Sequence, residues 1–186
     1  MKPNYLLDYN GKPFFIECGF SADKFFNKHR NKIIKHYKKH SKEWIEKDIY
    51  NVPYFEAHDE LGPRLTKTLN SIFYTDSKSP YKIEARVYVQ TPKKQYTIMH
   101  CHGNNDIPPK FCSVLYTNLP KEGGGFGFMY NDEEVQINVK ENTLYFFHSS
   151  VPHRPLPHTG KETRVCLNID WFTDSNSMFK EFDHYW

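Results

Sequence analysis

Short stretches of alternating hydrophobic and polar residues dominate the second half of the chain, from about residue 82 onward. In "EVQINV", Val135, Ile137 and Val139 would lie on one side of an extended chain, and the polar residues between them on the other. This period of two is typical of a half-buried antiparallel strand. The strand-like runs are "YKIEARVYVQ", "QYTIMHCH", "KFCSVLYTNL", "GFGFMY", "EVQINV", "TLYFFH" and "TRVCLNIDWF". Seven such runs separated by turns, with no helix signal between them, predict a β-sandwich or a jelly-roll barrel.

The N-terminal part shows a different pattern, a hairpin followed by helix signals. Two apolar runs flank Asn10-Gly11, the dipeptide that most readily forms the tight turn of a hairpin. After Ser21, which can cap a helix, large apolar residues recur at steps of seven, four and seven positions: Phe26, Ile33, Tyr37 and Trp44. A second helix is predicted to start near Pro63 and to bury Leu65, Leu69, Ile72 and Phe73. The expected fold class is therefore mostly β, with N-terminal helices that support one sheet.

The length of 186 residues favours one domain with a sizeable core. We expect a hairpin with supporting helices in residues 1–80, a β core in residues 82–172 and a C-terminal tail in residues 173–186. Aromatic residues make up 17% of the chain, which suits rings packed around a cavity and excludes a disordered composition. The net charge of +3 is too small to demand a polyanionic partner. Nine of the 25 Lys and Arg residues fall in residues 24–47, which we interpret as a solvated helix face; a nucleic acid or another acidic partner is the less favoured alternative.

The cysteine pattern and the hydropathy favour a soluble cytoplasmic protein without a membrane partner. Cys18, Cys101, Cys112 and Cys166 form no C-x-x-C pair, and no asparagine begins an N-x-[ST] sequon. No stretch approaches the roughly 20 apolar residues needed to cross a bilayer, and the first residues lack the apolar centre of a signal peptide. We therefore expect an intracellular, reducing environment.

Histidines mark the candidate chemistry. At the end of a strand "QYTIMHCH", His100 and His102 would project to the same side, because side chains alternate along a strand. His153 follows a later aromatic strand, and Arg164 heads the last strand on its polar face. A barrel mouth would gather these four groups. The pattern therefore predicts a metal site with an arginine available to a ligand.

The order "H-x-H … GGGFGF … ENTLYFF … H … TR" resembles the 2-oxoglutarate and Fe(II)-dependent oxygenases, in their prolyl 4-hydroxylase-like branch. The resemblance covers residues 82–172 and includes "SVLYTNLP" and "VPHRPLP". It implies a double-stranded β-helix, which is a jelly-roll, cupin-like core. It also implies that His100 and His153 bind iron and that Arg164 pairs with the remote carboxylate of 2-oxoglutarate, as the planar fork of arginine suits. Tyr116 would be a second donor to this cosubstrate, with a plain core tyrosine as the alternative.

The activity implied by the resemblance is a dioxygenase reaction. O2 and 2-oxoglutarate would be consumed, a C–H bond of a protein side chain or small molecule would be hydroxylated, and succinate and CO2 would be released. The protein would bind and orient the cosubstrate and tune the metal. Tyr88 and Arg86 on the preceding strand are further candidates to face the cavity.

The departure from the family pattern is His102, because the usual motif is H-x-D or H-x-E. One interpretation makes His102 the third ligand of a three-histidine site, since imidazole also binds ferrous iron. The alternative is that Asp106 reaches back to the metal through the loop that begins at Gly103. We favour His102 because it keeps the spacing of the family.

Two other function classes are compatible with H-x-H on a jelly roll. A cupin-type metal enzyme or sugar-binding protein usually adds a glutamate shortly after the motif, which "GNNDIPPK" lacks, and Arg164 has no role in it. A catalytically inactive jelly-roll binding module is favoured only by the missing carboxylate. The glycines of "KEGGGFGF" predict a turn into a strand, since they lack the context of a nucleotide-binding loop. His148 and His158 are interpreted as surface or hydrogen-bonded residues.

Overall fold

The computed structural model describes residues 4–9, 12–19, 24–47, 49–54, 63, 82–102, 109 and 111–172. Within these residues it is mostly β, with one long helix. The helix is α1 (Lys24–Glu46), and the strands are β1 (Asn4–Tyr9), β2 (Lys12–Gly19), β3 (Asn51–Pro53), β4 (Lys82–Gln90), β5 (Phe111–Asn118), β6 (Phe126–Tyr130), β7 (Glu133–Ile137), β8 (Thr143–His148), β9 (His153–Pro155) and β10 (Arg164–Phe172). The mostly β class is confirmed. Beyond Pro63 itself, the second predicted helix lies outside the described residues, and so does the tail 173–186.

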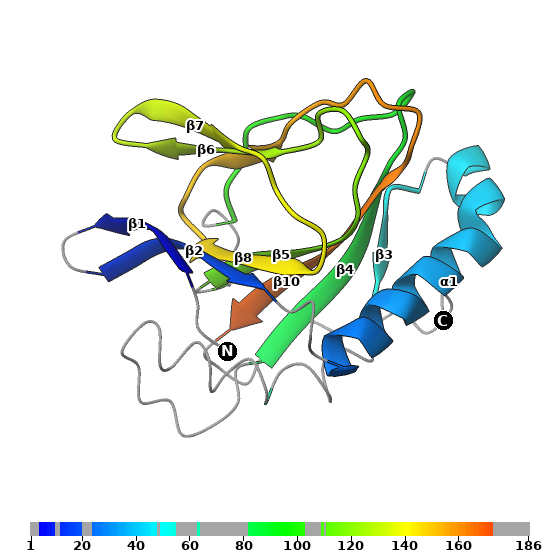
Figure 1. Ribbon diagram of the computed structural model, residues 1–186, viewed down its shortest axis with the longest axis horizontal. Coiled ribbons are helices and arrows are strands. Elements are labelled where there is room, and N and C mark those ends of the chain that lie inside the picture. Colours follow the sequence, from blue (N-terminus) through cyan, green and yellow to red (C-terminus); the bar gives the residue numbers. More distant parts are fainter. Residues whose placement is uncertain are drawn as a thin grey trace.

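The strands form two antiparallel sheets that face each other (Figure 1). The large sheet has the order β1-β2-β8-β5-β10-β4-β3, and the small sheet has the order β7-β6-β9. Along β10, Val165, Leu167 and Ile169 face the core on the α1 side, whereas Cys166 belongs to the core between the sheets. The alternation predicted for the last strand is therefore correct, and Arg164 lies on the face that points between the sheets.

The N-terminal hairpin extends the large sheet. β1 pairs with β2 up to Tyr9 and Lys12, as expected for a turn at positions 10 and 11, and β2 then pairs with β8. Phe15 of β2 is fully buried, and its ring stacks on Phe128 of the small sheet at 4.4 Å between centroids. Residues before 80 thus complete both the main sheet and the aromatic core between the sheets.

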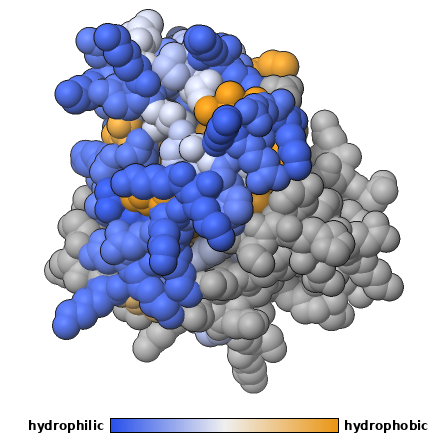
Figure 2. Space-filling model, turned by 90° about the vertical axis from the view of Figure 1, so that its right-hand side faces the viewer, coloured by the Kyte–Doolittle hydropathy of each residue, from blue (hydrophilic) through white to orange (hydrophobic). Residues whose placement is uncertain are grey.

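Helix α1 covers the outer face of the large sheet with the predicted apolar stripe. Phe26, Ile33 and Trp44 are buried there, and Tyr37 packs against the same cluster. The hydroxyl group of Tyr37 lies 3.0 Å from Thr163 Oγ1, just before β10. Figure 2, which faces the α1 side, shows an outer surface that is mainly hydrophilic. The described part of the chain contains no helix that is long and apolar enough to span a membrane.

The prediction of a strand at residues 95–102 is wrong, because this segment does not form a β-ladder. Its pairing is an isolated bridge between His100 and His153. The physical reason is the available partner: β9 has three residues, so the edge that it leaves free beside β6 is too short for a ladder with this segment. The alternation in "QYTIMHCH" therefore arises in an extended loop.

Candidate metal centre

His100, His102 and His153 come together at one end of the cleft between the sheets. Their ligand atoms all lie within 4.8 Å of one another. The backbone fixes two of them directly: the amide of His100 donates to the carbonyl of His153 at 2.9 Å, and the amide of His153 donates back at 2.8 Å. The amide of His102 donates to the carbonyl of Ser149 at 3.0 Å. The three predicted histidines are thus gathered although their segment is not a strand.

The hydrogen bonds of the three rings determine which nitrogen atoms can bind a metal. Nδ1 lies 3.0 Å from the carbonyl oxygen of Ile98 in His100 and 2.8 Å from that of Val151 in His153. A carbonyl oxygen can only accept, so Nδ1 carries the proton in both rings, and the lone pair of each neutral ring lies on Nε2. In His102, Nδ1 lies 2.8 Å from a carboxylate oxygen of Asp170, which leads to the same assignment. All three rings therefore have Nε2 available as a ligand.

The surroundings of the cluster favour uncharged imidazole. Burial lowers the pKa of His153 to about 3, and burial also lowers the pKa of His100. Aromatic rings supply the apolar wall: Phe126 is stacked on His153 at 5.5 Å between ring centroids, and Phe147 is tilted against it at 4.6 Å. Neutral imidazole is the form that coordinates a metal, and it suits Fe, Zn, Cu and Ni.

Asp170 is the functional candidate that sequence reasoning missed. It belongs to β10, in line with Arg164 and Cys166, and its contact with His102 joins residues 68 positions apart in the chain. The sequence did indicate that Asp170 lies on the same polar face as Arg164, which is the signal that could have suggested it. Asp106, the alternative source of a carboxylate, lies outside the described residues.

Arg164 is a buried cation with neutral partners. Arg164 is only 3% exposed. Its side chain donates to Gln90 Oε1 at 3.0 Å and to the hydroxyl oxygen of Tyr116 at 2.9 Å. Its Nε is buried and finds no hydrogen-bond partner in the part of the chain that the structure describes. Among the described residues, no carboxylate forms an ion pair with Arg164. Since a guanidinium group stays charged in proteins and a buried charge needs compensation, this arrangement indicates an anionic ligand.

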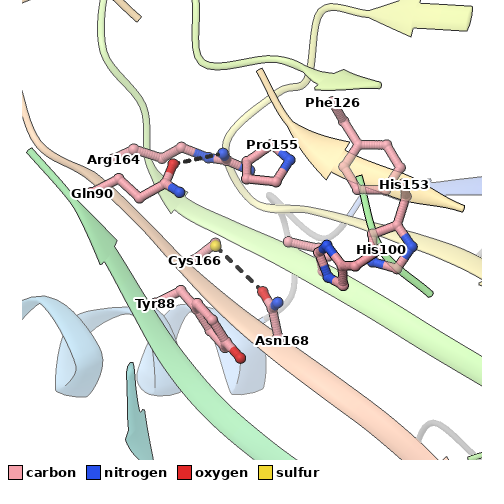
Figure 3. A pocket seen from close by; sticks show the side chains of 10 residues that line it. Tyr88, Gln90, His100, Phe126, His153, Pro155, Arg164, Cys166 and Asn168 are labelled. Atoms are coloured by element: carbon pink, nitrogen blue, oxygen red, sulfur yellow. Dashed lines mark hydrogen bonds between the residues drawn. The ribbon is translucent and has the colours of Figure 1, made fainter. Parts of the chain in front are cut away.

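One small cavity joins Arg164 to two of the three histidines, His100 and His153 (Figure 3). Arg164 and Gln90 lie at one side, His100 and His153 at the other, and Cys166 and Asn168 of β10 lie between them. The remaining lining residues are Tyr88, Val114, Phe126 and Pro155. The cavity therefore combines a metal-binding type of cluster with an anion-binding type of residue.

Of the residues that the sequence suggested less strongly, some line this cavity and others do not. Tyr88 lines it, as expected, whereas Arg86 is not among its lining residues and lies 3.8 Å from Glu84. Tyr116 is fully buried behind Arg164 and is also not a lining residue. His148, interpreted as a surface residue, is exposed, with Nδ1 2.8 Å from Ser150 Oγ.

Comparison with solved structures finds a similar fold in several oxygenases. A viral collagen prolyl hydroxylase from Paramecium bursaria Chlorella virus-1 aligns with a TM-score of 0.63 and 20% identity, covering 89% of this chain and 92% of that one; it was also solved as a 2OG complex. A Pseudomonas putida prolyl-4-hydroxylase aligns with a TM-score of 0.62 and 14% identity over 87% and 93%. The non-heme alpha ketoglutarate dependent carbocyclase SnoK from nogalamycin biosynthesis aligns with a TM-score of 0.53 and 11% identity over 85% and 79%. No protein-family model matches the sequence, and neither does any curated protein. At these identities, the likeness shows the fold.

Proposed function

We propose that this chain is a 2-oxoglutarate- and Fe(II)-dependent dioxygenase of the prolyl 4-hydroxylase-like branch, built as one domain on a double-stranded β-helix. It hydroxylates a C–H bond of a protein side chain or small molecule and releases succinate and CO2. The observation that carries the proposal is the buried Arg164, which has no anionic partner among the described residues and shares a cavity with a histidine cluster.

The residues present fit both implied groups. His100, His102 and His153 would hold the iron through Nε2, because their Nδ1 protons are already donated to oxygen atoms. Arg164 would hold the remote carboxylate of 2-oxoglutarate, and its unpartnered Nε is a donor that such an anion would satisfy. When bound, iron with 2-oxoglutarate would supply the electrons that activate O2 for the hydroxylation of a C–H bond.

The contribution of the protein is orientation and exclusion of water. Gln90 and Tyr116 hold the guanidinium group of Arg164 from two directions, which limits the ways in which it can meet a carboxylate. Gln90 also donates through Nε2 to the carbonyl oxygen of Tyr96 at 2.8 Å, which connects this clamp to the segment that carries His100. Phe126 and Phe147 pack against His153 and keep water away from that side of the cluster.

The alternatives account for fewer of these contacts. A cupin-type enzyme or sugar-binding protein gives Arg164 no task, although its burial without an anion is costly. An inactive binding module gives no reason for three imidazole rings whose Nδ1 protons all point to oxygen atoms. The viral prolyl hydroxylase with the same fold binds 2OG in its complex, which supports the assignment of the cosubstrate.

The proposal predicts an absorption signal under anaerobic conditions. Adding Fe(II) and 2-oxoglutarate together is expected to produce the weak visible charge-transfer band of the chelate, because the keto acid binds the metal while its far end meets Arg164. Succinate, which lacks the keto acid, is the control and is expected to give no band. Iron binding without a band would contradict the oxygenase and favour the cupin-type alternative. Absence of iron binding would favour the inactive module.

The basic face of α1 is predicted to be dispensable for cosubstrate turnover. Lys35, Lys38, Lys39 and Lys42 are exposed on the outer side of the large sheet, away from the cavity between the sheets. Replacing all four with glutamate is expected to leave uncoupled succinate formation within about twofold, because none of the four side chains lines the cavity and exposed substitutions away from special features usually change stability only slightly. Circular dichroism checks that α1 remains folded. A large loss of turnover in a folded variant would show that this face takes part in the reaction.

A further inference from the structure

The carboxylate missing from the H-x-H motif has a counterpart on a distant strand. His100 and His153 donate their Nδ1 protons to neutral backbone carbonyls. His102 stands where the family pattern places a carboxylate, and its Nδ1 instead faces the carboxylate of Asp170 at 2.8 Å. Of the three rings, the one at the position of the missing charge is thus the one whose partner carries a charge.

Asp170 is held in place by the sheet and by a second donor. In the antiparallel register, it stands opposite Cys112 of β5 and Glu84 of β4. The buried thiol of Cys112 forms a side-chain hydrogen bond with Asp170, and burial raises the pKa of this thiol well above its ordinary value, so it stays protonated and donates. The carboxylate therefore accepts one hydrogen bond from His102 and one from Cys112.

We propose that Asp170 is a positioning residue that returns the missing negative charge to the metal site through the ring of His102. The hydrogen bond directs Nε2 of His102 toward His100 and His153 and makes the ring a stronger electron donor. The charge acts from one ring farther away than the carboxylate of the usual motif. This inference rests on the metal site of the proposed function, but not on the identity of the cosubstrate or the substrate.

Asp170 could also be imagined as a direct ligand, since His102, Cys112 and Asp170 form a second group whose ligand atoms lie within 4.8 Å. A metal there would have to displace the buried thiol proton of Cys112 and the hydrogen bond between His102 and Asp170. The three-histidine group requires neither change. The geometry therefore favours Asp170 as the acceptor behind His102.

The test measures metal binding rather than activity. Asp170→Asn keeps the size of the side chain and removes its charge, and it is expected to weaken Co(II) and Fe(II) binding about 10- to 100-fold in anaerobic calorimetry. The visible spectrum of the Co(II) protein is expected to shift, because the donor strength of His102 changes. Glu84→Gln is the matched control, because it neutralises the carboxylate of Glu84, which stands opposite Asp170 and lies 3.8 Å from Arg86. It should leave the metal affinity and the Co(II) spectrum unchanged.

A double variant separates action through His102 from a general structural effect. In a His102→Asp background, there is no ring for Asp170 to orient, so adding Asp170→Asn should cause no further loss of metal affinity. An equal loss in both backgrounds would overturn the inference, and so would unchanged affinity in Asp170→Asn alone. A loss of metal affinity in Asp170→Ala as severe as that in His153→Ala would indicate that Asp170 is a direct ligand, and this result would also overturn the inference. Metal binding without the 2-oxoglutarate band would contradict the oxygenase while leaving the role of Asp170 intact, whereas a wild-type protein that binds no metal would overturn both.

Discussion

Replacing Arg164 with alanine is expected to raise the 2-oxoglutarate concentration needed for half-maximal succinate formation by about 30- to 5,000-fold. Losing one partner of a buried, charge-assisted pair typically costs about 2–5 kcal/mol. Iron binding should change little, because Arg164 reaches Gln90 and Tyr116 and none of the three histidines. Titrations of cosubstrate and of metal on the same preparation measure the two effects separately.

A conservative variant controls for damage to the fold. Arg164→Lys keeps the positive charge but loses the planar fork, so it should bind 2-oxoglutarate more weakly than the wild type and more tightly than Arg164→Ala. Thermal unfolding of both variants reports on the loss of the contacts with Gln90 and Tyr116. Unchanged cosubstrate affinity in a folded Arg164→Ala protein would show that Arg164 does not bind 2-oxoglutarate.

Alanine at His100, His102 or His153 is expected to abolish tight iron binding to a similar degree in each case. A three-ligand site that loses one ligand leaves the ion mostly to water. His102→Asp is expected to retain iron, because it restores the motif of the family at the same spacing. Anaerobic iron titration of the four variants, with folding checked by circular dichroism, measures the effect.

Asp106→Ala provides the competing outcome for this series. If His102 is a ligand, the Asp106 variant should bind iron like the wild type. Loss of iron in Asp106→Ala together with retention in His102→Ala would refute our ligand assignment, and His102 would then support the metal only indirectly. The oxygenase proposal would survive that result, because the cavity and Arg164 do not depend on it.

The alternation of side chains made most strands of the large sheet predictable, because hydrogen-bonded neighbours keep these strands extended and the layers packed on the sheet bury their faces. β10 pairs with β5 on one edge and β4 on the other, so its pattern translates directly into two faces. The segment 95–102 has the same kind of pattern but no continuous partner, and pattern alone does not reveal a missing neighbour. Strands β3 and β9 were not predicted, since each has three residues that end in a proline, which gives too short a pattern.

Sequence reasoning about the site succeeded where the motif had a known spacing and failed where the contact was long-range. His100, His102 and His153 were proposed together from the H-x-H spacing and the histidine after a later strand, and they do lie together. The bond between His102 and Asp170 spans 68 positions, and it depends on the register of β10 against its neighbours. No local pattern encodes that register. The clamp of Gln90 on Arg164 was missed for the same reason.

The loop that carries His100 and His102 also has a kinetic meaning. The described contacts that attach residues 95–102 to the sheets include the paired bonds between His100 and His153, the bond from His102 to Ser149 and the bond from Gln90 to Tyr96, while Ile98 is 65% exposed. Opening of this segment would withdraw two metal ligands at once and leave His153 behind on β9. The residence time of a bound ion would then follow the rate of this local opening rather than the stepwise breaking of single ligand bonds. Conversely, an ion bound to both the loop and β9 would stabilise the closed segment. Amide exchange at His100 would then become slower as retention of the metal becomes longer.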